Sequence, residues 1–168
     1  PTRSSAASDV YKRQDMCCGD TSNNTVFKMP THYGTHIDFP YHFSSSGKKS
    51  SNYKASDFIF NKSVCIEINP NEVEKYLISI DNLSSVIENV DEGTELLFVK
   101  TGFCDKRNTN EYWEFGFGSH PDTAFYLKSK FPKLKAIAFD LISMNSYQQR
   151  EIGREAHKQF LIEHEILI

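Results

Sequence analysis

The sequence lacks the features that mark several large classes of protein. It contains no run of about 18 apolar residues, which a helix would need to cross a bilayer. It contains no block of basic residues, and its formal net charge is -3, so nucleic acid and anionic membrane surfaces are poor partners. We therefore expect a protein that neither enters a membrane nor binds nucleic acid.

Cysteine is sparse, and no CxxC spacing is present. An adjacent pair and two scattered residues make a weak disulfide framework, so the pattern favours a reducing compartment and a cytoplasmic location. Buried, small, apolar side chains are the simpler role for such thiols. The four residues are Cys17, Cys18, Cys65 and Cys104.

The composition is otherwise that of an ordinary globular domain. Of the 168 residues, 39% are hydrophobic and 24% are charged, which is enough for one domain with a core. Short apolar runs alternate with stretches of helical period, so we predict the α/β class, as a single domain with a mixed β-sheet and flanking helices. Strands are expected over residues 25–29, 64–68, 76–80, 95–100 and 134–139, with a last strand starting at 165. Helices are expected over 81–87 (capped by Ser79 or Asp81), 122–130 and 151–164, and a loop over 108–119.

The first fourteen residues show no hydrophobic period and join abruptly to the rest. Their last six residues, DVYKRQ, back-translate readily to GAT GTG TAT AAG AGA CAG, which resembles the transposase-end adapter used in shotgun sequencing. We predict that residues 1–14 are a non-native, adapter-like tail and that residues 15–168 form one domain, incomplete at both ends. The alternative is a genuine polar tail.

The segment 32–42, HYGTHIDFPYH, carries the chemistry. Gly34 and Pro40 argue against a helix, and side chains at even positions of an extended chain share one face. The odd positions are apolar, aromatic or β-branched, so we expect that face to pack on a core. Four ligand-type side chains occupy even positions: His32, His36, Asp38 and His42.

Distance adds a constraint to this segment. Residues two apart on a strand are ~6.6 Å apart, whereas residues 32 and 42 would be ~33 Å apart in a straight chain. They can join one site only if the chain bends, and Gly34 and Pro40 stand where bends are needed. Imidazoles and a carboxylate suit zinc, manganese or iron(II). The alternative is a set of scattered surface histidines beside an ordinary aspartate.

The pattern HxGTHxDxPxH resembles the signature of the kynurenine formamidase (cyclase) family, and every fixed position is matched. The resemblance extends more loosely along the chain, as an ordered set of weaker motifs. These motifs are Asp57-Phe58 after the Gly47-Lys48 turn, Leu97 to Gly102, Gly116 to Ala124, Phe139-Asp140 and Glu155 to Lys158.

The resemblance implies a role for each matching residue. The family's metal ligands match four residues: His32, His36, Asp38 and His157. Asp38 would bridge where two metals bind, and His42 matches the catalytic proton donor and acceptor. A last glutamate ligand would directly follow Ile168, so the 168-residue chain is expected to be impaired.

The resemblance also implies a swivelling β/β/α fold, a homodimer and one or two divalent cations, with zinc expected first and manganese as the alternative. The expected activity is hydrolysis of a carbon–nitrogen amide bond in a small aryl amide, N-formylkynurenine being split to kynurenine and formate. The alternatives are hydrolysis of isatin or another cyclic amide, a non-catalytic metal-binding protein, or a plain α/β domain without a site. Four aromatic residues could stack on an aryl substrate or simply pack in the core: Phe39, Tyr41, Phe43 and Trp113.

Overall fold

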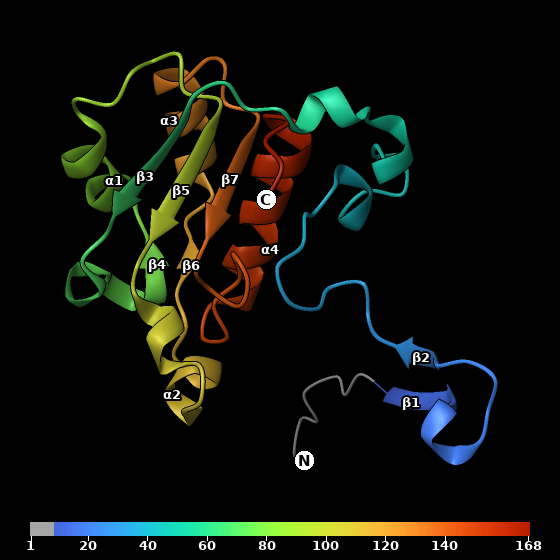
Figure 1. Ribbon diagram of the computed structural model, residues 1–168. Helices are drawn as coiled ribbons and strands as arrows, with labels where there is room; N and C mark the ends of the chain where they lie inside the picture. The colour runs from blue at the N-terminus through green and yellow to red at the C-terminus, as the bar shows by residue number, and fades with distance from the viewer. Residues whose placement is uncertain (1–8) are drawn as a thin grey trace. The chain divides into compact units, whose positions relative to one another are not determined.

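The computed structural model describes residues 9–168 (Figure 1). The chain divides into two compact units, Pro1–Ile37 and Asp38–Ile168, which are described separately. The first eight residues of the predicted adapter-like tail lie outside the described part. None of the helices in residues 9–168 has the length and apolar character needed to span a bilayer.

The first unit contains an antiparallel pair of strands, β1 (Asp9–Gln14) and β2 (Asn24–Lys28). A 3-10 turn, Met16–Cys18, lies between them; Asp15 caps it by accepting a hydrogen bond from the Cys17 N–H. β2 confirms the strand predicted over residues 25–29. β1 falls within the segment predicted to be non-native, and its pairing does not test that prediction, which stays a prediction.

The second unit is built on three parallel strands in the order β3–β5–β7 (Figure 1). Their bounds are Ser63–Glu67, Leu96–Lys100 and Ala136–Phe139. Two further short strands, β4 (Leu77–Ile78) and β6 (Gly118–Ser119), pair in parallel. The strand predicted from residue 165 is present as an isolated parallel bridge between Leu167 and Ala136.

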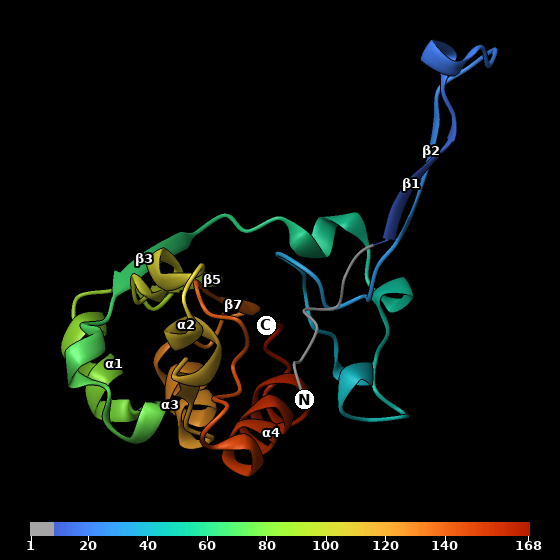
Figure 2. The same ribbon diagram turned by 90° about the horizontal axis from the view of Figure 1, so that it is seen from below.

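Helices cover one face of the three-stranded sheet, since α1, α3 and α4 lie on the same side of it in Figure 2. The helices are α1 (Ile80–Ile87), α2 (Asn110–Glu114), α3 (Asp122–Lys130) and α4 (Arg150–Lys158). The remaining turns of this unit are 3-10 turns at Pro40–His42, Ser50–Asn52, Ala55–Phe58, Pro70–Glu72, Glu74–Tyr76 and Phe103–Lys106, and a π-helical turn at Gln159–Glu163.

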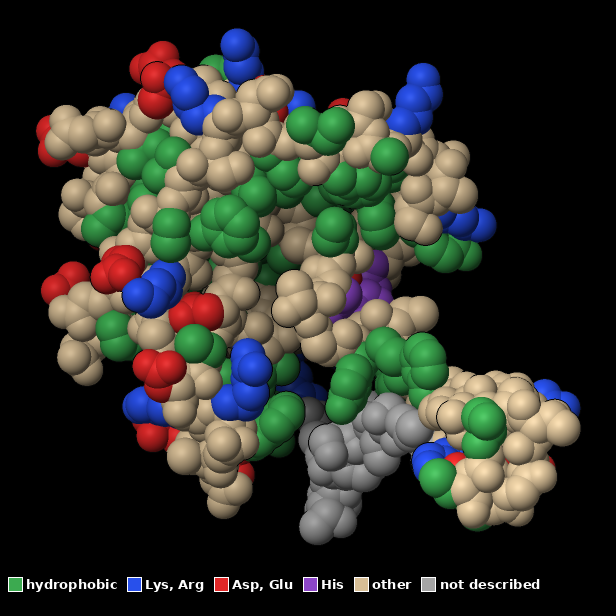
Figure 3. Space-filling model, viewed as in Figure 1, with side chains coloured by type: hydrophobic (Ala, Val, Ile, Leu, Met, Phe, Trp, Pro, Cys, Tyr) green, Lys and Arg blue, Asp and Glu red, His purple; other side chains and the backbone are tan. Residues whose placement is uncertain are grey.

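The core lies between this sheet and the helices. Leu97 and Val99 of β5 are buried, whereas Phe98 between them is 43% exposed, which is the alternation expected of a strand with one covered face. Figure 3 shows hydrophobic side chains exposed across the other face of the sheet. The helices contribute buried side chains to the same core: Leu83, Ile87, Ala124, Leu127, Ala156 and Phe160.

The α/β class is confirmed, with two local corrections. Residues 108–119 are not a continuous loop, because they contain α2 and β6. Thr109 caps α2 by accepting from the Tyr112 N–H, and β6 owes its existence to pairing with β4, which no local pattern reveals. The helix predicted over 151–164 is α-helical only through Lys158 and then widens into the π-helical turn.

Candidate metal centre

The segment that carries the ligand-type residues bends where the sequence predicts. Gly34 has φ +65°, a left-handed conformation that costs glycine little because it has no Cβ. Pro40 begins the 3-10 turn that ends at His42. The expectation that the odd face packs on a core is wrong for Tyr33, Ile37 and Tyr41, which are 46%, 46% and 48% exposed, and holds for Phe39, which is half-buried. The bends break the strand-like alternation on which that expectation rested.

Two histidines at the end of the first unit are hydrogen-bonded to each other. His36 Nδ1 lies 2.8 Å from the Gly34 carbonyl oxygen, and His32 Nδ1 lies 3.1 Å from His36 Nε2. A carbonyl only accepts, so His36 carries its proton on Nδ1 and offers Nε2 as an acceptor. Orientation of an imidazole by a backbone carbonyl is typical of metal-ligating histidines.

The same short segment forms a candidate cation-binding group. His32, His36 and Asp38 each offer one ligand atom, and these atoms all lie within 4.8 Å of one another. The two histidines are exposed, whereas Asp38 is 8% exposed. Three of the four predicted metal ligands therefore come together within seven consecutive residues.

His157 of α4 is the fourth predicted ligand, and it is 3% exposed. Its Nδ1–H donates to the Gly153 carbonyl oxygen at 2.7 Å, which fixes the tautomer and leaves Nε2 as the ligand-type atom. Nε2 lies 4.0 Å from Asp38 Oδ2. This gap is too long for a hydrogen bond, and both atoms are of types that bind divalent cations.

Glycine at position 153 explains how α4 comes so close to the loop after β7. A Cβ on Gly153 would lie 2.1 Å from Asn145 Oδ1 and 2.7 Å from Asn145 Cα. A glycine inside a predicted helix usually has such a packing reason, and this signal could have marked Gly153 in the sequence. The close approach fixes the turn of helix whose carbonyl oxygen orients His157.

His42, the predicted proton donor and acceptor, is exposed at the end of the Pro40–His42 turn. Its ring centroid lies 6.1 Å from that of His157 and 4.5 Å from that of Phe43. Phe43 in turn stacks on His157, with a centroid distance of 4.6 Å and an interplanar angle of 27°. His42 and His157 therefore share one aromatic cluster, and Phe43 joins them.

The aromatic residues proposed for substrate stacking have different surroundings. Phe39 packs on Tyr53 and Phe58. Tyr41 is 48% exposed and Trp113 is 52% exposed, so neither is a core residue. Among these four aromatic residues, Phe43 is the one whose ring contacts with site histidines are described, and stacking on a substrate stays a prediction.

The loop after His42 is tied to the C-terminal segment. Lys48 Nζ lies 2.6 Å from Glu165 Oε1, and this ammonium lowers the pKa of the Glu165 carboxyl. The Lys48 carbonyl oxygen accepts from the Tyr41 N–H at 3.0 Å. The Ile168 carbonyl oxygen accepts from the Asp38 N–H at 2.7 Å. These bonds hold both ends of the Asp38–His42 stretch to the body of the second unit.

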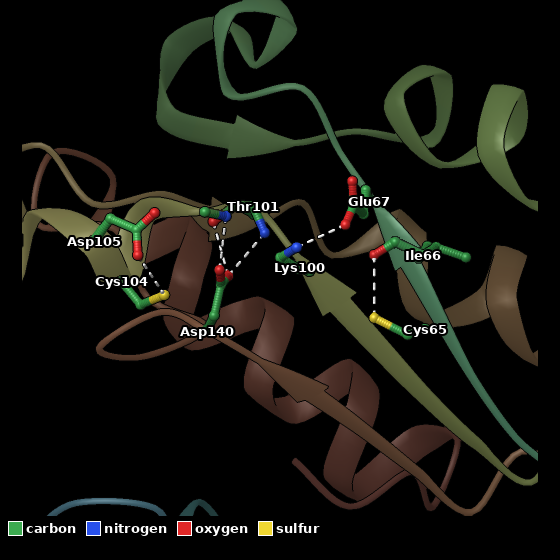
Figure 4. A network of polar contacts seen from close by, with 9 residues as sticks. Cys65, Ile66, Glu67, Lys100, Thr101, Cys104, Asp105 and Asp140 are labelled. Carbon is green, nitrogen blue, oxygen red and sulfur yellow. Dashed lines mark hydrogen bonds and ion pairs between the residues drawn. The ribbon is translucent and has the colours of Figure 1, made fainter.

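Two other motifs singled out in the sequence meet at the ends of β5 and β7 (Figure 4). Asp140 Oδ1 accepts from the Thr101 N–H at 2.9 Å and from its hydroxyl at 2.8 Å, and Oδ2 accepts from the Gly102 N–H at 2.7 Å. Burial raises the pKa of the nearby Cys104 thiol, and the negative charge of Asp140 raises it further. The Thr-Gly pair and Asp140 thus form a structural tie between strands.

A cavity of about 440 Å³ opens beyond the end of β5. Its lining includes the aromatic residues Tyr76, Phe103, Phe115 and Phe117, together with Lys106 and Glu111. The five predicted site residues are not part of this lining.

The donor set fits a divalent cation. Imidazole nitrogen and carboxylate oxygen are ligands of zinc and manganese, and two of the three imidazoles are oriented by backbone carbonyls. All four cysteines are free, and none belongs to the group. Of the four predicted ligands, His32, His36 and Asp38 form the group that would hold a cation, and His157 is described beside Asp38.

A family model and curated relatives both match this sequence. The sequence model of the family described as "Putative cyclase" matches residues 4–146, which include His32, His36, Asp38 and His42 but not His157. The kynurenine formamidase of Bacillus cereus (strain ATCC 10987 / NRS 248) is 31% identical over 145 residues, and that of Bacillus mycoides (strain KBAB4) is 30% identical. Each alignment covers 83% of this chain and 60% of the relative, so the chain spans about 60% of the length of these relatives.

Solved structures share the fold. Isatin hydrolase A from Labrenzia aggregata, bound to benzyl benzoate, superposes with a TM-score of 0.76 at 14% identity, over 95% of this chain and 68% of that one. A protein described as a "potential metal-dependent hydrolase with cyclase activity" superposes with a TM-score of 0.61 at 20% identity and the same coverage. Because the family model matches well over half of the sequence, this chain belongs to the cyclase family.

Proposed function

We propose that this chain carries the metal centre of a hydrolase that cleaves carbon–nitrogen amide bonds, and that its substrate is N-formylkynurenine. The observation that carries the proposal is the buried His157, whose Nε2 faces Asp38 Oδ2 at 4.0 Å while its Nδ1–H is held by a backbone carbonyl. The curated relatives named kynurenine formamidase supply the substrate class.

The four ligand residues would hold the cation. When bound, a divalent cation polarises the substrate carbonyl and lowers the pKa of a water molecule to about 7. A role for Asp38 is supported by its burial and by the hydrogen bond from its N–H to the Ile168 carbonyl oxygen. A role for His157 is supported by its Nδ1, which lies 2.7 Å from the Gly153 carbonyl oxygen, and by its Nε2, which lies 4.0 Å from Asp38 Oδ2. We expect zinc, with manganese as the alternative.

His42 would act as the general acid and base. It is exposed, so a substrate can reach it, and histidine titrates near neutral pH. In the reaction the amide C–N bond breaks, the water oxygen joins the formyl carbon to give formate, and His42 passes the water proton to the departing aryl amine. Such general acid–base help contributes about 10²- to 10⁴-fold to a rate.

A second candidate substrate is a cyclic aryl amide of the isatin kind. The fold shared with isatin hydrolase A supports it, although at 14% identity that likeness concerns the fold alone. The two candidates differ in the product, since a linear formamide releases formate and a cyclic amide opens to a single molecule. Product analysis distinguishes them.

The test begins with the purified full-length protein that contains this chain, loaded with zinc or manganese and freed of excess metal. Bound metal is measured by mass spectrometry, and hydrolysis of N-formylkynurenine and of isatin by absorbance. We expect His42→Ala to keep its metal and to lose about 10²- to 10⁴-fold in rate. The matched control is His164→Ala, whose ring packs on Phe125.

Unchanged hydrolysis by metal-loaded His42→Ala would refute the proton role. Stoichiometric metal without turnover on either substrate would favour the alternative, a metal-binding protein without catalysis. A full-length protein that retains neither zinc nor manganese would refute the metal centre itself.

A further inference from the structure

We infer that Phe43 is a positioning residue for His157: its ring fixes the plane of the imidazole and therefore the direction in which Nε2 points. The inference rests on the proposed function for its consequence, because Nε2 is the atom that would bind the cation. The geometry on which it is based belongs to the second unit alone.

The hydrogen bond from Nδ1–H to Gly153 restricts the rotation of the His157 ring, but a hydrogen bond tolerates a range of angles. The ring can therefore tilt within that range, and Nε2 moves with the tilt. Tilting is opposed by contact on the ring face. Phe43 supplies that contact as a stacked pair at 4.6 Å and 27°, within the range of favourable aromatic geometries.

Phe43 is itself held in place. Its N–H donates to the Pro40 carbonyl oxygen at 3.1 Å, closing the turn that carries His42. The Phe43 ring also makes an edge-to-face contact with the His42 ring, at 4.5 Å and 83°, which further limits its movement. Phe43 thus connects the His42 turn to α4, and the face that stacks on His157 is not open to a substrate ring.

Ordinary apolar packing is the competing explanation, and the chain offers a matched comparison. Phe58 is half-buried like Phe43, and it packs in an aromatic cluster with Phe39 and Tyr53. Replacing either phenylalanine with leucine removes similar apolar area. Only Phe43→Leu removes a flat surface from His157.

The experiment compares Phe43→Leu with Phe58→Leu in the full-length protein that contains this chain. The first readout is the NMR signal of the His157 Nδ1–H proton in metal-free protein, where we expect faster exchange with water in Phe43→Leu and no change in Phe58→Leu. The second is the zinc dissociation constant, measured by competition with a chromophoric chelator. We expect zinc binding to weaken about 2- to 10-fold in Phe43→Leu, as the loss of an aromatic pair predicts.

Phe43→Tyr keeps an aromatic ring, so both readouts should equal those of wild type. A role in filling volume alone would not require an aromatic ring at this position. Phe43→Met, of similar volume and no flat face, replaces the leucine variant if that variant does not fold. An unchanged Nδ1–H signal in the leucine or methionine variant would overturn the inference. If the wild-type chain binds no zinc, the proposed function fails, whereas the metal-free NMR comparison still decides the role of Phe43.

Discussion

Gly47 offers a sharp test of how the His42 turn is held. A Cβ at this position would lie 2.5 Å from the Pro40 carbonyl carbon, 2.7 Å from the Pro40 oxygen and 2.8 Å from the Tyr41 nitrogen. All three are backbone atoms, so no side chain can rotate to make room. Gly47 does not have a left-handed φ, and alanine therefore brings a steric effect without a conformational one.

The size of the effect follows from these distances. Ordinary contact begins near 3.4 Å, so the backbone of Pro40 must move by 0.9 Å from a Cβ at 2.5 Å. Overpacking of this kind costs about 1–3 kcal/mol of unfolding free energy. Pro40 begins the turn that carries His42, and a catalytic group displaced by ~1 Å can lose about 10²-fold in rate.

We expect Gly47→Ala to lower the urea midpoint followed by circular dichroism and to lower hydrolysis about 10²-fold in the metal-loaded full-length protein. Gly93→Ala is the matched control, because the atoms nearest to its Cβ belong to the Asp91 and Lys62 side chains, which can rotate. Equal unfolding free energies and rates for Gly47→Ala and wild type would refute the claim that the Gly47–Pro40 contact sets the turn.

Three further predictions concern the second unit. Ser79→Ala removes the cap that accepts from the Asn82 N–H and should cost about 1 kcal/mol in urea unfolding. Asp140→Asn puts an amide where a carboxylate accepts three hydrogen bonds, among them that of the Gly102 N–H, and should cost about 1–3 kcal/mol in the same assay. Burial and Asp140 raise the pKa of the Cys104 thiol, and the thiolate is the reactive form, so its alkylation should reach half-maximal rate at a higher pH than in a free cysteine peptide.

Each of these predictions has an outcome that contradicts it. For the cap, Ser84→Ala on the exposed side of α1 should be nearly neutral, and equal losses in the two serine variants would remove the special role of Ser79. An Asp140→Asn chain as stable as wild type would show that the tie between strands is dispensable. For Cys104, peptide mass spectrometry follows the alkylation, and a midpoint at or below that of the free peptide would contradict the raised pKa.

Local chemistry accounts for the elements that the sequence predicted well. The helix predicted over 122–130 has those bounds in α3, because Pro121 precedes it and Pro132 follows it. Ser79 caps α1, one of the two caps expected. The failures lie where tertiary contacts decide: β6 has two residues and exists through its pairing with β4, and α2 is too short to show a hydrophobic period.

The candidate site divides in the same way. By itself, the sequence determined the ligand chemistry and the bends at Gly34 and Pro40, because glycine permits a left-handed backbone and proline fixes its own φ. Only the tertiary structure decided that Asp38 meets His157 from α4 and that Phe43 lies flat on that imidazole. Residues so far apart along the chain meet only when the sheet and helices have packed, so no local pattern encodes their distance or the angle between their rings.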